Sequence, residues 1–378
     1  MKIGIDIRNI GKKRTGDEVV FFNIVKNLAL IDDQNEYFLF TDIADAEILH
    51  EVAESLGIKN KNNFRIVTIK TKNKFTWNFC TLPRYLRKNP VDIYQTQYIT
   101  PFFVSRKIKI ATIIHDISFK IYPQFIKWTD LFFLKLLIPL SLKRANKIIG
   151  VSQFTRDEIA RHYKINPKKV DFIQNAVGDN FFKKISSEKL EETRKKYKLP
   201  QKFILYIGTL QPRKNIPSLI EAYASAFENK DEVKLVLAGG KGHNFDSKID
   251  RAIEKHDLKN NVILPGYIDE EDKPAIFKLA HVFCFPSFYE GFSIPVLEAM
   301  TLGIPVLASK IPPHEEVAGN SALLFDVNDK KDLEEKLLKI CYDENLRKNI
   351  SEKEKMQAQN FSWKKTVEKI SIIYKDLE

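Results

Sequence analysis

Two glutamates, Glu290 and Glu298, lie eight residues apart in the otherwise apolar stretch FYEGFSIPVLEAM, residues 288–300. A carboxylate in apolar surroundings is costly unless it binds something, because the charge loses its water. Its two oxygens can accept hydrogen bonds side by side, which suits the vicinal hydroxyls of a sugar or a ribose. We expect Glu290 in a loop and Glu298 about one turn into the next helix, with both facing one cleft.

The same stretch predicts a helix from about residue 294 that ends at Gly303, a typical C-cap. A proline in its first turn fits that start. The backbone amides of Phe292, Ser293 and Ile294 would open the helix and could bind phosphate. The alternative is that one glutamate only caps the helix and that the other is solvated.

Arg213 and Lys214 form the second candidate group, in the stretch GTLQPRKNIPSLIEAY. They follow a predicted strand over 203–208 and precede a helix with Asn215 as its expected N-cap and Pro217 in its first turn. A guanidinium, an ammonium and a helix N-terminus at one point favour a diphosphate site. Two solvated surface cations would be the ordinary alternative.

Three further loops follow predicted strands. His115 opens HDISF and could donate to a sugar hydroxyl or a phosphate, or be a structural histidine. Gly266 and Tyr267 lie in LPGYIDEED, where backbone groups could read a nucleobase and Asp269 is expected to cap the next helix. Gly16 lies in IGKKRTGDEVV, which lets backbone approach a ligand but is not the G-x-G-x-x-G of a dinucleotide site.

The loops belong to strands that alternate with helix-length segments, which predicts parallel βαβ units. One series runs from KIGIDI to KIIGVS, and a second begins at KFILYIGTL after a polar helix near 186–199. The chain of 378 residues is long enough for two domains. We therefore predict an α/β protein with two doubly wound parallel sheets and a boundary near residue 180. The segment FSWKKTVEKISIIYKDLE predicts a final amphipathic helix.

The net charge and the cysteine content limit the classes of binding partner and the cellular compartment that we expect. The formal net charge is +12, and residues 1–180 hold 29 of the 61 Lys and Arg but only 18 of the 49 Asp and Glu. Such a surplus favours phospholipid surfaces, nucleic acid or a phosphorylated substrate, or it is only solubilising. Three cysteines without a C-x-x-C spacing indicate neither disulfides nor a cysteine zinc site, and fit a cytoplasmic protein. We expect no signal peptide and no transmembrane segment.

Taken together, GIDIRN, HDISF, GTLQPRKN, LPGY and EGFSIPVLEAMTLGIPVLAS resemble glycosyltransferase family 4 over essentially the whole chain. This is a family of retaining nucleotide-sugar enzymes with the GT-B fold, two Rossmann-like domains that face a central cleft. The resemblance implies an N-terminal acceptor-side domain over 1–180 and a nucleotide-sugar domain over 181–360. It also implies that a helix over 361–378 crosses back to the first domain.

The resemblance assigns roles residue by residue. Glu298 would bind the ribose hydroxyls, and Glu290 would contact hydroxyls of the transferred sugar near the reacting carbon. Arg213 and Lys214 would neutralise the diphosphate. Amides near Gly16 and at residues 292–294 would do the same, and His115 would touch the donor sugar and help to stabilise the transition state.

The resemblance also shapes the expected reaction. Fixed cations would stabilise the departing diphosphate, so no metal and no other cofactor are expected, and the chain has no D-x-D motif. The subgroup resembles mannosyltransferases, with GDP-mannose as the first choice of donor and a saccharide or lipid-linked acceptor, as in cell-surface polysaccharide synthesis. One departure is TGDEVV, where the family has T-G-I-G-R-Y. The negative charges of Asp17 and Glu18 would be unfavourable near a diphosphate. We expect either that Lys12, Lys13 or Arg14 offsets these charges or that the two carboxylates face the acceptor.

Two other readings remain open. A non-hydrolysing nucleotide-sugar epimerase of the same fold would turn over the donor without an acceptor. The second is a non-catalytic basic protein that binds nucleic acid. Against this hypothesis, the cations are not interleaved with aromatic stacking motifs. Residues 51–150 hold 18 Lys and Arg against 5 Asp and Glu, which suggests peripheral contact with an anionic membrane.

Overall fold

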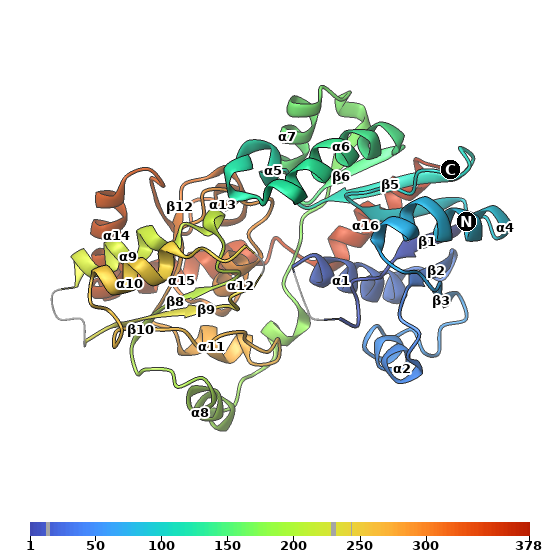
Figure 1. Cartoon of the computed structure of the whole chain (residues 1–378). Helices are drawn as coiled ribbons and strands as arrows, with labels where there is room; N and C mark the ends of the chain where they lie inside the picture. The colour runs from blue at the N-terminus through green and yellow to red at the C-terminus, as the bar shows by residue number, and fades with distance from the viewer. Residues whose placement is uncertain (13–15, 228–231, 243) are drawn as a thin grey trace. The chain divides into compact units, whose positions relative to one another are not determined.

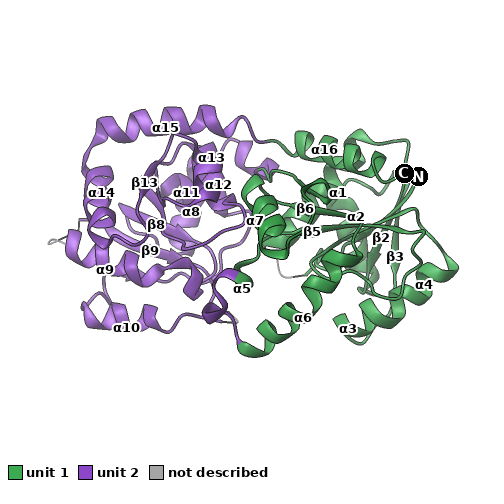
Figure 2. Ribbon diagram, turned by 90° about the horizontal axis from the view of Figure 1, so that it is seen from above, with its two compact units in different colours: residues 1–120, 128–176, 362–378 green, residues 121–127, 177–361 purple. Residues whose placement is uncertain are grey.

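A computed structural model describes residues 1–12, 16–227, 232–242 and 244–378 of the chain (Figure 1). The chain divides into two compact units (Figure 2). Unit 1 consists of residues 1–120, 128–176 and 362–378, and unit 2 of residues 121–127 and 177–361. Each unit contains one parallel β-sheet and is described by itself.

The sheet of unit 1 has seven parallel strands in the order β3-β2-β1-β4-β5-β6-β7. Their apolar, β-branched residues are almost all buried, as expected for strands covered on both faces. The register pairs Ile3 of β1 with Tyr37 of β2 on one side and Ile93 of β4 on the other. The strands are β1 (Lys2–Asp6), β2 (Glu36–Thr41), β3 (Phe64–Thr68), β4 (Ile93–Gln97), β5 (Lys109–Ile114), β6 (Lys147–Gly150) and β7 (Val170–Phe172).

The strands of unit 1 are connected through helices. The longer ones are α1 (Gly16–Ile31), α2 (Ala46–Ser55), α4 (Leu82–Lys88), α6 (Trp128–Arg144), α7 (Gln153–Tyr163) and α16 (Trp363–Lys375). Short turns of helix are α3 (Lys74–Thr76), the π-helix η1 (Trp77–Thr81), α5 (Ser118–Ile121), which ends at the first residue of unit 2, and the 3₁₀ turn η3 (Pro167–Lys169).

Helix α16 is the last helix of the chain but belongs to unit 1. The hydroxyl of Tyr374 donates a hydrogen bond to Gln95 of β4, and that of Thr366 donates to the backbone carbonyl of Gln174. Apolar residues at helical spacing along it, Trp363 and Val367 among them, are buried, as expected for the predicted amphipathic helix. The helix is therefore held by its apolar face and by two long-range hydrogen bonds.

Unit 2 has six parallel strands in the order β10-β9-β8-β11-β12-β13. The strands are β8 (Phe203–Ile207), β9 (Lys234–Ala238), β10 (Val262–Ile263), β11 (Val282–Phe285), β12 (Val306–Ser309) and β13 (Leu323–Phe325). The helices are α8 (Ser187–Lys196), α9 (Ile216–Ala226), α10 (Lys248–Lys255), α11 (Lys273–Leu279), α12 (Ile294–Leu302), α13 (Pro312–Ala318), α14 (Lys330–Tyr342) and α15 (Glu344–Ala358), with 3₁₀ turns η2 (Pro123–Phe125), η4 (Asp179–Phe182) and η5 (Pro212–Lys214).

Both sheets reverse their direction of winding at an internal pair of strands. In unit 1 the chain moves outward from β1 to β3 and then returns to place β4 on the other side of β1. In unit 2 the same reversal separates β8 from β11. Ligands of open parallel sheets bind outside the carboxyl ends of such strands, because the two loops diverge there. The prediction of two doubly wound parallel sheets is confirmed, and the β8 and β11 loops carry the predicted cations and Glu290.

Some local predictions differ from the structure. β13 was not predicted, since a strand of three residues gives too short an alternation to recognise. The helix over 294–302 and its end at Gly303 are as predicted, and Gly303 has the left-handed backbone (φ 68°) of a C-cap.

Within the described ranges, no helix is both long enough and apolar enough to cross a membrane.

Candidate active site

Arg213, Lys214 and Glu290 meet at the carboxyl ends of β8 and β11. Lys214 Nζ donates to Glu290 Oε1 at 2.6 Å, and Arg213 Nη1 donates to Glu290 Oε2 at 2.9 Å. Arg213 Nη1 also donates to the backbone carbonyl of Tyr289 at 2.7 Å, and the Phe288 amide donates to the Arg213 carbonyl at 2.9 Å. The two loops are thus joined by both backbone and side-chain hydrogen bonds.

The sequence around Arg213 and Lys214 positions them at the sheet edge. Pro212 starts the 3₁₀ turn η5, and Asn215 then takes a left-handed conformation (φ 55°) before α9 begins. Asn215 is the N-cap position as predicted, although its side chain makes no capping hydrogen bond there. This tight turn directs two consecutive cationic side chains from the end of β8 toward Glu290.

The electrostatics of this cluster favour an ionised glutamate. Burial by itself raises the pKa of Glu290, but the charges of Arg213 and Lys214 lower it to about 2. Lys214 Nζ also lies 4.9 Å from the centroid of the Phe285 ring, a cation–π distance. Two cations and one carboxylate leave a net positive charge in a buried position. Such a cluster can bind an anion of phosphate type with charge-assisted hydrogen bonds.

Helix α12 begins beside this cluster in the sequence. Ser293 is its N-cap residue, Ile294 its first residue and Pro295 lies in its first turn. Phe292 is buried, and its ring meets that of Phe361 edge-on at 5.9 Å between centroids. The first-turn amides of a helix have no intrahelical partner, so amides at this helix start can donate to an anion.

Glu298 is buried one turn into α12 but has other charged neighbours than Glu290. The pKa of Glu298 is raised to about 7, mainly by burial; the charge of Lys273 opposes this rise, and that of Glu270 adds to it. Lys273 Nζ pairs with the Glu270 carboxylate at 2.6 Å. Burial lowers the pKa of Lys273, but the charges of Glu298 and Glu270 outweigh it and raise that pKa. The two glutamates therefore belong to two different charge clusters.

Lys273 and Glu270 were not among the predicted site residues. Lys273 is the first residue of α11, and nothing in DEEDKPA distinguishes a partly buried lysine from a solvated one. Tyr267 interacts electrostatically with Lys273, so the predicted Gly266–Tyr267 loop joins the Glu298 cluster. Gly266 has a left-handed backbone (φ 82°), and its carbonyl accepts the Gly239 amide at 2.8 Å.

The capping prediction for Asp269 is wrong. The N-cap position of α11 is Asp272, and no side chain there makes a capping hydrogen bond. Asp269 instead accepts from Lys196 Nζ of α8 at 2.7 Å, and Lys196 also reaches Asp272 at 2.6 Å. Because α8 packs on α11, a lysine competes successfully for the carboxylate that the local sequence assigns to capping.

His115 follows β5 in unit 1 and is buried. Its Nε2 lies 2.8 Å from Gln97 Oε1, and its Nδ1 lies 3.7 Å from Asp17 Oδ1. The ring centroid is 5.6 Å from that of Tyr98, which has a left-handed backbone (φ 54°). The Gln97 carbonyl oxygen can accept a hydrogen bond from Nε2–H, and Nδ1 then faces the carboxylate of Asp17. The imidazole is thus held between the end of β4 and the start of α1.

The TGDEVV loop is partly explained by this contact. Gly16 is the first residue of α1, and Asp17 and Glu18 lie in its first turn, where carboxylates favour the helix dipole. Lys12, one candidate for offsetting these acids, instead pairs with Asp42 at 2.8 Å. Lys13 and Arg14 lie outside the described residues. Gln97 was missed as a site residue, although its place at the end of β4 could have indicated it.

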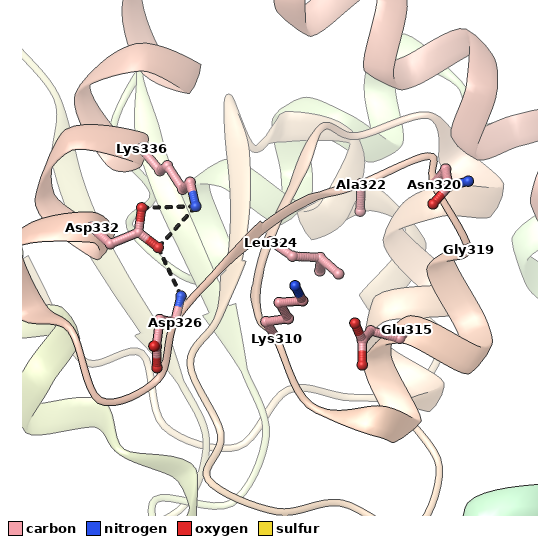
Figure 3. Close-up of a pocket in the computed structure, with 9 residues that line it drawn as sticks. All are labelled: Lys310, Glu315, Gly319, Asn320, Ala322, Leu324, Asp326, Asp332 and Lys336. Atoms are coloured by element: carbon pink, nitrogen blue, oxygen red, sulfur yellow. Dashed lines mark hydrogen bonds and ion pairs between the residues drawn. The ribbon is translucent and has the colours of Figure 1, made fainter.

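A pocket of about 770 Å³ lies elsewhere in unit 2, along the edge strand β13 (Figure 3). Lys310 and Glu315 face it from one side, and Asp332 lies on the other. Asp332 accepts the Asp326 amide at 2.8 Å and pairs with Lys336 at 2.7 Å, which stabilises the start of α14. The pocket contains none of the predicted site residues.

In the described part of the chain, no three His, Cys, Asp or Glu side chains are grouped so as to hold a metal ion.

Comparison with known proteins matches two family descriptions to the two halves of the chain. Residues 16–181 match "Glycosyltransferase Family 4", and residues 189–357 match "Glycosyl transferases group 1". The O-antigen chain mannosyltransferase B of Escherichia coli is 28% identical over 96% of each chain. The O-antigen chain mannosyltransferase RfbU of Salmonella typhimurium is 27% identical over 86% of this chain and 87% of its own length.

A solved structure supports the fold. The Anabaena protein Alr3699/HepE, determined with UDP and glucose, covers 100% of both chains with a TM-score of 0.74 and 17% sequence identity. The match agrees with the two Rossmann-like units described above.

Proposed function

The chain belongs to glycosyltransferase family 4, and from that premise we propose that it transfers mannose from GDP-mannose to a saccharide or lipid-linked acceptor. The cluster of Arg213, Lys214 and Glu290 carries this proposal, because a buried, net-positive group at the switch point of a parallel sheet suits the diphosphate of a nucleotide sugar. The choice of mannose is supported by the names of the two bacterial relatives, each similar over most of its length.

In the proposed reaction the bond between the anomeric carbon and the diphosphate oxygen breaks. Its electron pair stays on the diphosphate, where Arg213 and Lys214 stabilise the growing negative charge. The acceptor hydroxyl oxygen forms the new bond on the same face of the sugar, and its proton passes to the departing phosphate. The anomeric configuration is retained. Glu290 holds the two cations and accepts hydrogen bonds from hydroxyls of the transferred sugar.

The remaining unit 2 residues bind the nucleotide in this proposal. Glu298 accepts the two ribose hydroxyls when it is ionised, and the Gly266–Tyr267 loop lies in the same charge cluster and contacts the base. The α12 amides from Phe292 to Ile294 add hydrogen bonds to the phosphates. In the same proposal His115 contacts the donor sugar and helps to stabilise the transition state, and backbone amides near Gly16 donate hydrogen bonds to the phosphates. No divalent metal takes part, because protein cations supply the charge.

The proposal is tested by nucleotide release from GDP-, UDP- and ADP-sugars, with and without saccharide acceptors. Arg213→Ala is compared with Arg251→Ala, which removes an exposed arginine of the same unit. We expect acceptor-stimulated release from GDP-mannose by the wild type and by Arg251→Ala, reduced at least about a hundredfold in Arg213→Ala. Release from a different donor overturns the choice of GDP-mannose, and conversion of the sugar without an acceptor overturns transfer in favour of epimerisation.

A further inference from the structure

Helix α6 exposes an apolar row on its outer face. Trp128, Phe132, Leu136 and Leu140 are 79%, 62%, 52% and 46% exposed and follow one another at intervals of four residues. Phe133 beside the row is 44% exposed. Helices at a protein surface normally carry polar residues on this side. The opposite side of α6, with Leu137 and Ile138 among others, packs into unit 1, so the helix is apolar on both faces.

The apolar surface continues onto two neighbouring segments of unit 1. Phe75 of α3 lies 5.3 Å from Phe133 between ring centroids, and α3 lies beside α6 (Figure 2). The segment at residues 99–109, which ends at the first residue of β5, is joined to α6 by the Thr100 amide, which donates to Ser141 Oγ at 3.1 Å. This loop exposes Phe103 by 66%. We call this surface the α6 face, made by Phe75, Phe103, Trp128, Phe132, Leu136 and Leu140.

The segments that form the α6 face are strongly basic. Residues 70–81, 99–109 and 128–144 together hold nine Lys and Arg and one acidic residue, Asp130. Seven of the cations are exposed, and among the described residues no ion pair joins any of them to a carboxylate: Lys70, Lys72, Lys74, Arg106, Lys107, Lys135 and Lys143. Exposed aromatic residues with unpaired cations around them match an anionic bilayer, whose phosphates attract the cations while the rings enter the interface.

We infer that the α6 face binds an anionic phospholipid bilayer. Charge decides between this occupant and a second copy of the chain. Two copies joined through the same face by a two-fold axis would bring the seven exposed cations of one copy against those of the other, which is unfavourable. A lipid surface brings the opposite charge. The inference concerns unit 1 alone and holds whatever donor the chain uses.

The test is co-sedimentation of the full chain with phosphatidylcholine vesicles, with and without phosphatidylglycerol, at low and at high salt. We expect binding only to the anionic vesicles, and weaker binding at high salt because salt screens the exposed cations. Trp77 and Trp363 are buried, so a blue shift in tryptophan emission on binding reports Trp128. The variant Trp128→Phe should lose that shift.

Two variants examine the face itself. Phe132→Ser with Leu136→Ser should weaken binding at least about tenfold, because two exposed apolar side chains no longer enter the interface. Lys135→Glu with Lys143→Glu should weaken it by about fivefold or more for each cation removed. Matched controls in unit 1 are Ile372→Ser, which removes an exposed apolar residue of α16, and Lys168→Glu.

Absence of wild-type binding at low salt overturns the inference, as does equal binding to neutral vesicles. Vesicle binding by both α6-face variants at the wild-type level also overturns it. If the wild type instead forms a dimer that the Phe132→Ser, Leu136→Ser variant dissociates, the face joins two copies. Donor turnover on a soluble acceptor should be unchanged in every variant, so a failure here is distinguishable from a failure of the proposed function.

Discussion

Lys214 Nζ lies 2.6 Å from Glu290 Oε1, although 76 positions separate the two residues in the chain. Arg213 occupies the second oxygen of the same carboxylate. Glu290 thus holds two cations side by side, and their charges stabilise its ionised form by lowering its pKa. A glutamate in this position is more than a hydrogen-bond acceptor for sugar, since it sets the geometry of the groups proposed to face the diphosphate.

Glu290→Gln should destabilise the protein by about 3 kcal/mol, because it leaves two largely buried cations without their carboxylate. The folded pKa of about 2 lies below the ordinary value of 4.5, so the ionised form is favoured in the folded protein. Its contribution is present above about pH 4.5 and is lost as the pH falls toward 2. Urea unfolding at pH 7 and at pH 3 measures both effects. A variant as stable as the wild type at pH 7 would contradict this account of the cluster.

Glu298 predicts the opposite pH dependence. Its folded pKa of about 7 lies above 4.5, so the folded state favours the protonated form. The stability that this confers is present below pH 4.5 and is lost as the pH rises to about 7. Relative to Glu298→Gln, the wild type should lose about 3 kcal/mol between those pH values. Chemical denaturation of both proteins at pH 4.5 and pH 8 tests this, and parallel curves would refute it.

The same titration should appear in nucleotide binding. Only the ionised Glu298 accepts both ribose hydroxyls, so GDP affinity should rise as the pH increases through about 7. Glu298→Gln should bind more weakly and without that rise. Calorimetric titration with GDP and with the 2′-deoxy analogue separates the ribose contact from a general change in stability. The idea fails if the wild-type affinity is flat across this range.

Gln97 is expected to position His115 through the 2.8 Å hydrogen bond to Nε2. Gln97→Ala should lower kcat about fivefold, since one such bond contributes about 1 kcal/mol, while KM for the donor changes little. Gln97→Glu keeps an acceptor and should restore most of the rate. If alanine and glutamate behave alike, the bond has no role in positioning the imidazole.

Removal of divalent metal should leave turnover unchanged, because Arg213 and Lys214 are proposed to stabilise the leaving diphosphate. The measurement is acceptor-stimulated release of GDP after dialysis against EDTA, with and without added Mg²⁺ or Mn²⁺. A rate that vanishes with EDTA and returns with either metal would show that the protein cations are insufficient.

Much of the architecture followed from the sequence, because it depends on local pattern. Apolar β-branched runs alternating with helical segments identify parallel βαβ units, and Pro295 and Gly303 indicate where α12 begins and ends. Loops after parallel strands are where ligands bind, so Arg213 and Glu290 could be chosen before any contact was known. These inferences need only residue type, spacing and the direction of the chain.

The side-chain contacts of these residues, in contrast, depend on the tertiary structure. Lys214 meets Glu290 because β8 lies beside β11, a strand order that the sequence of the loops does not specify. Lys273 reaches Glu298, and Asp17 reaches His115, through packing of separate elements. The apolar run in α6 was visible in the sequence, but which of its faces is exposed depends on what the helix packs against. Strand order and helix packing arise from burial of the whole chain, which no single segment encodes.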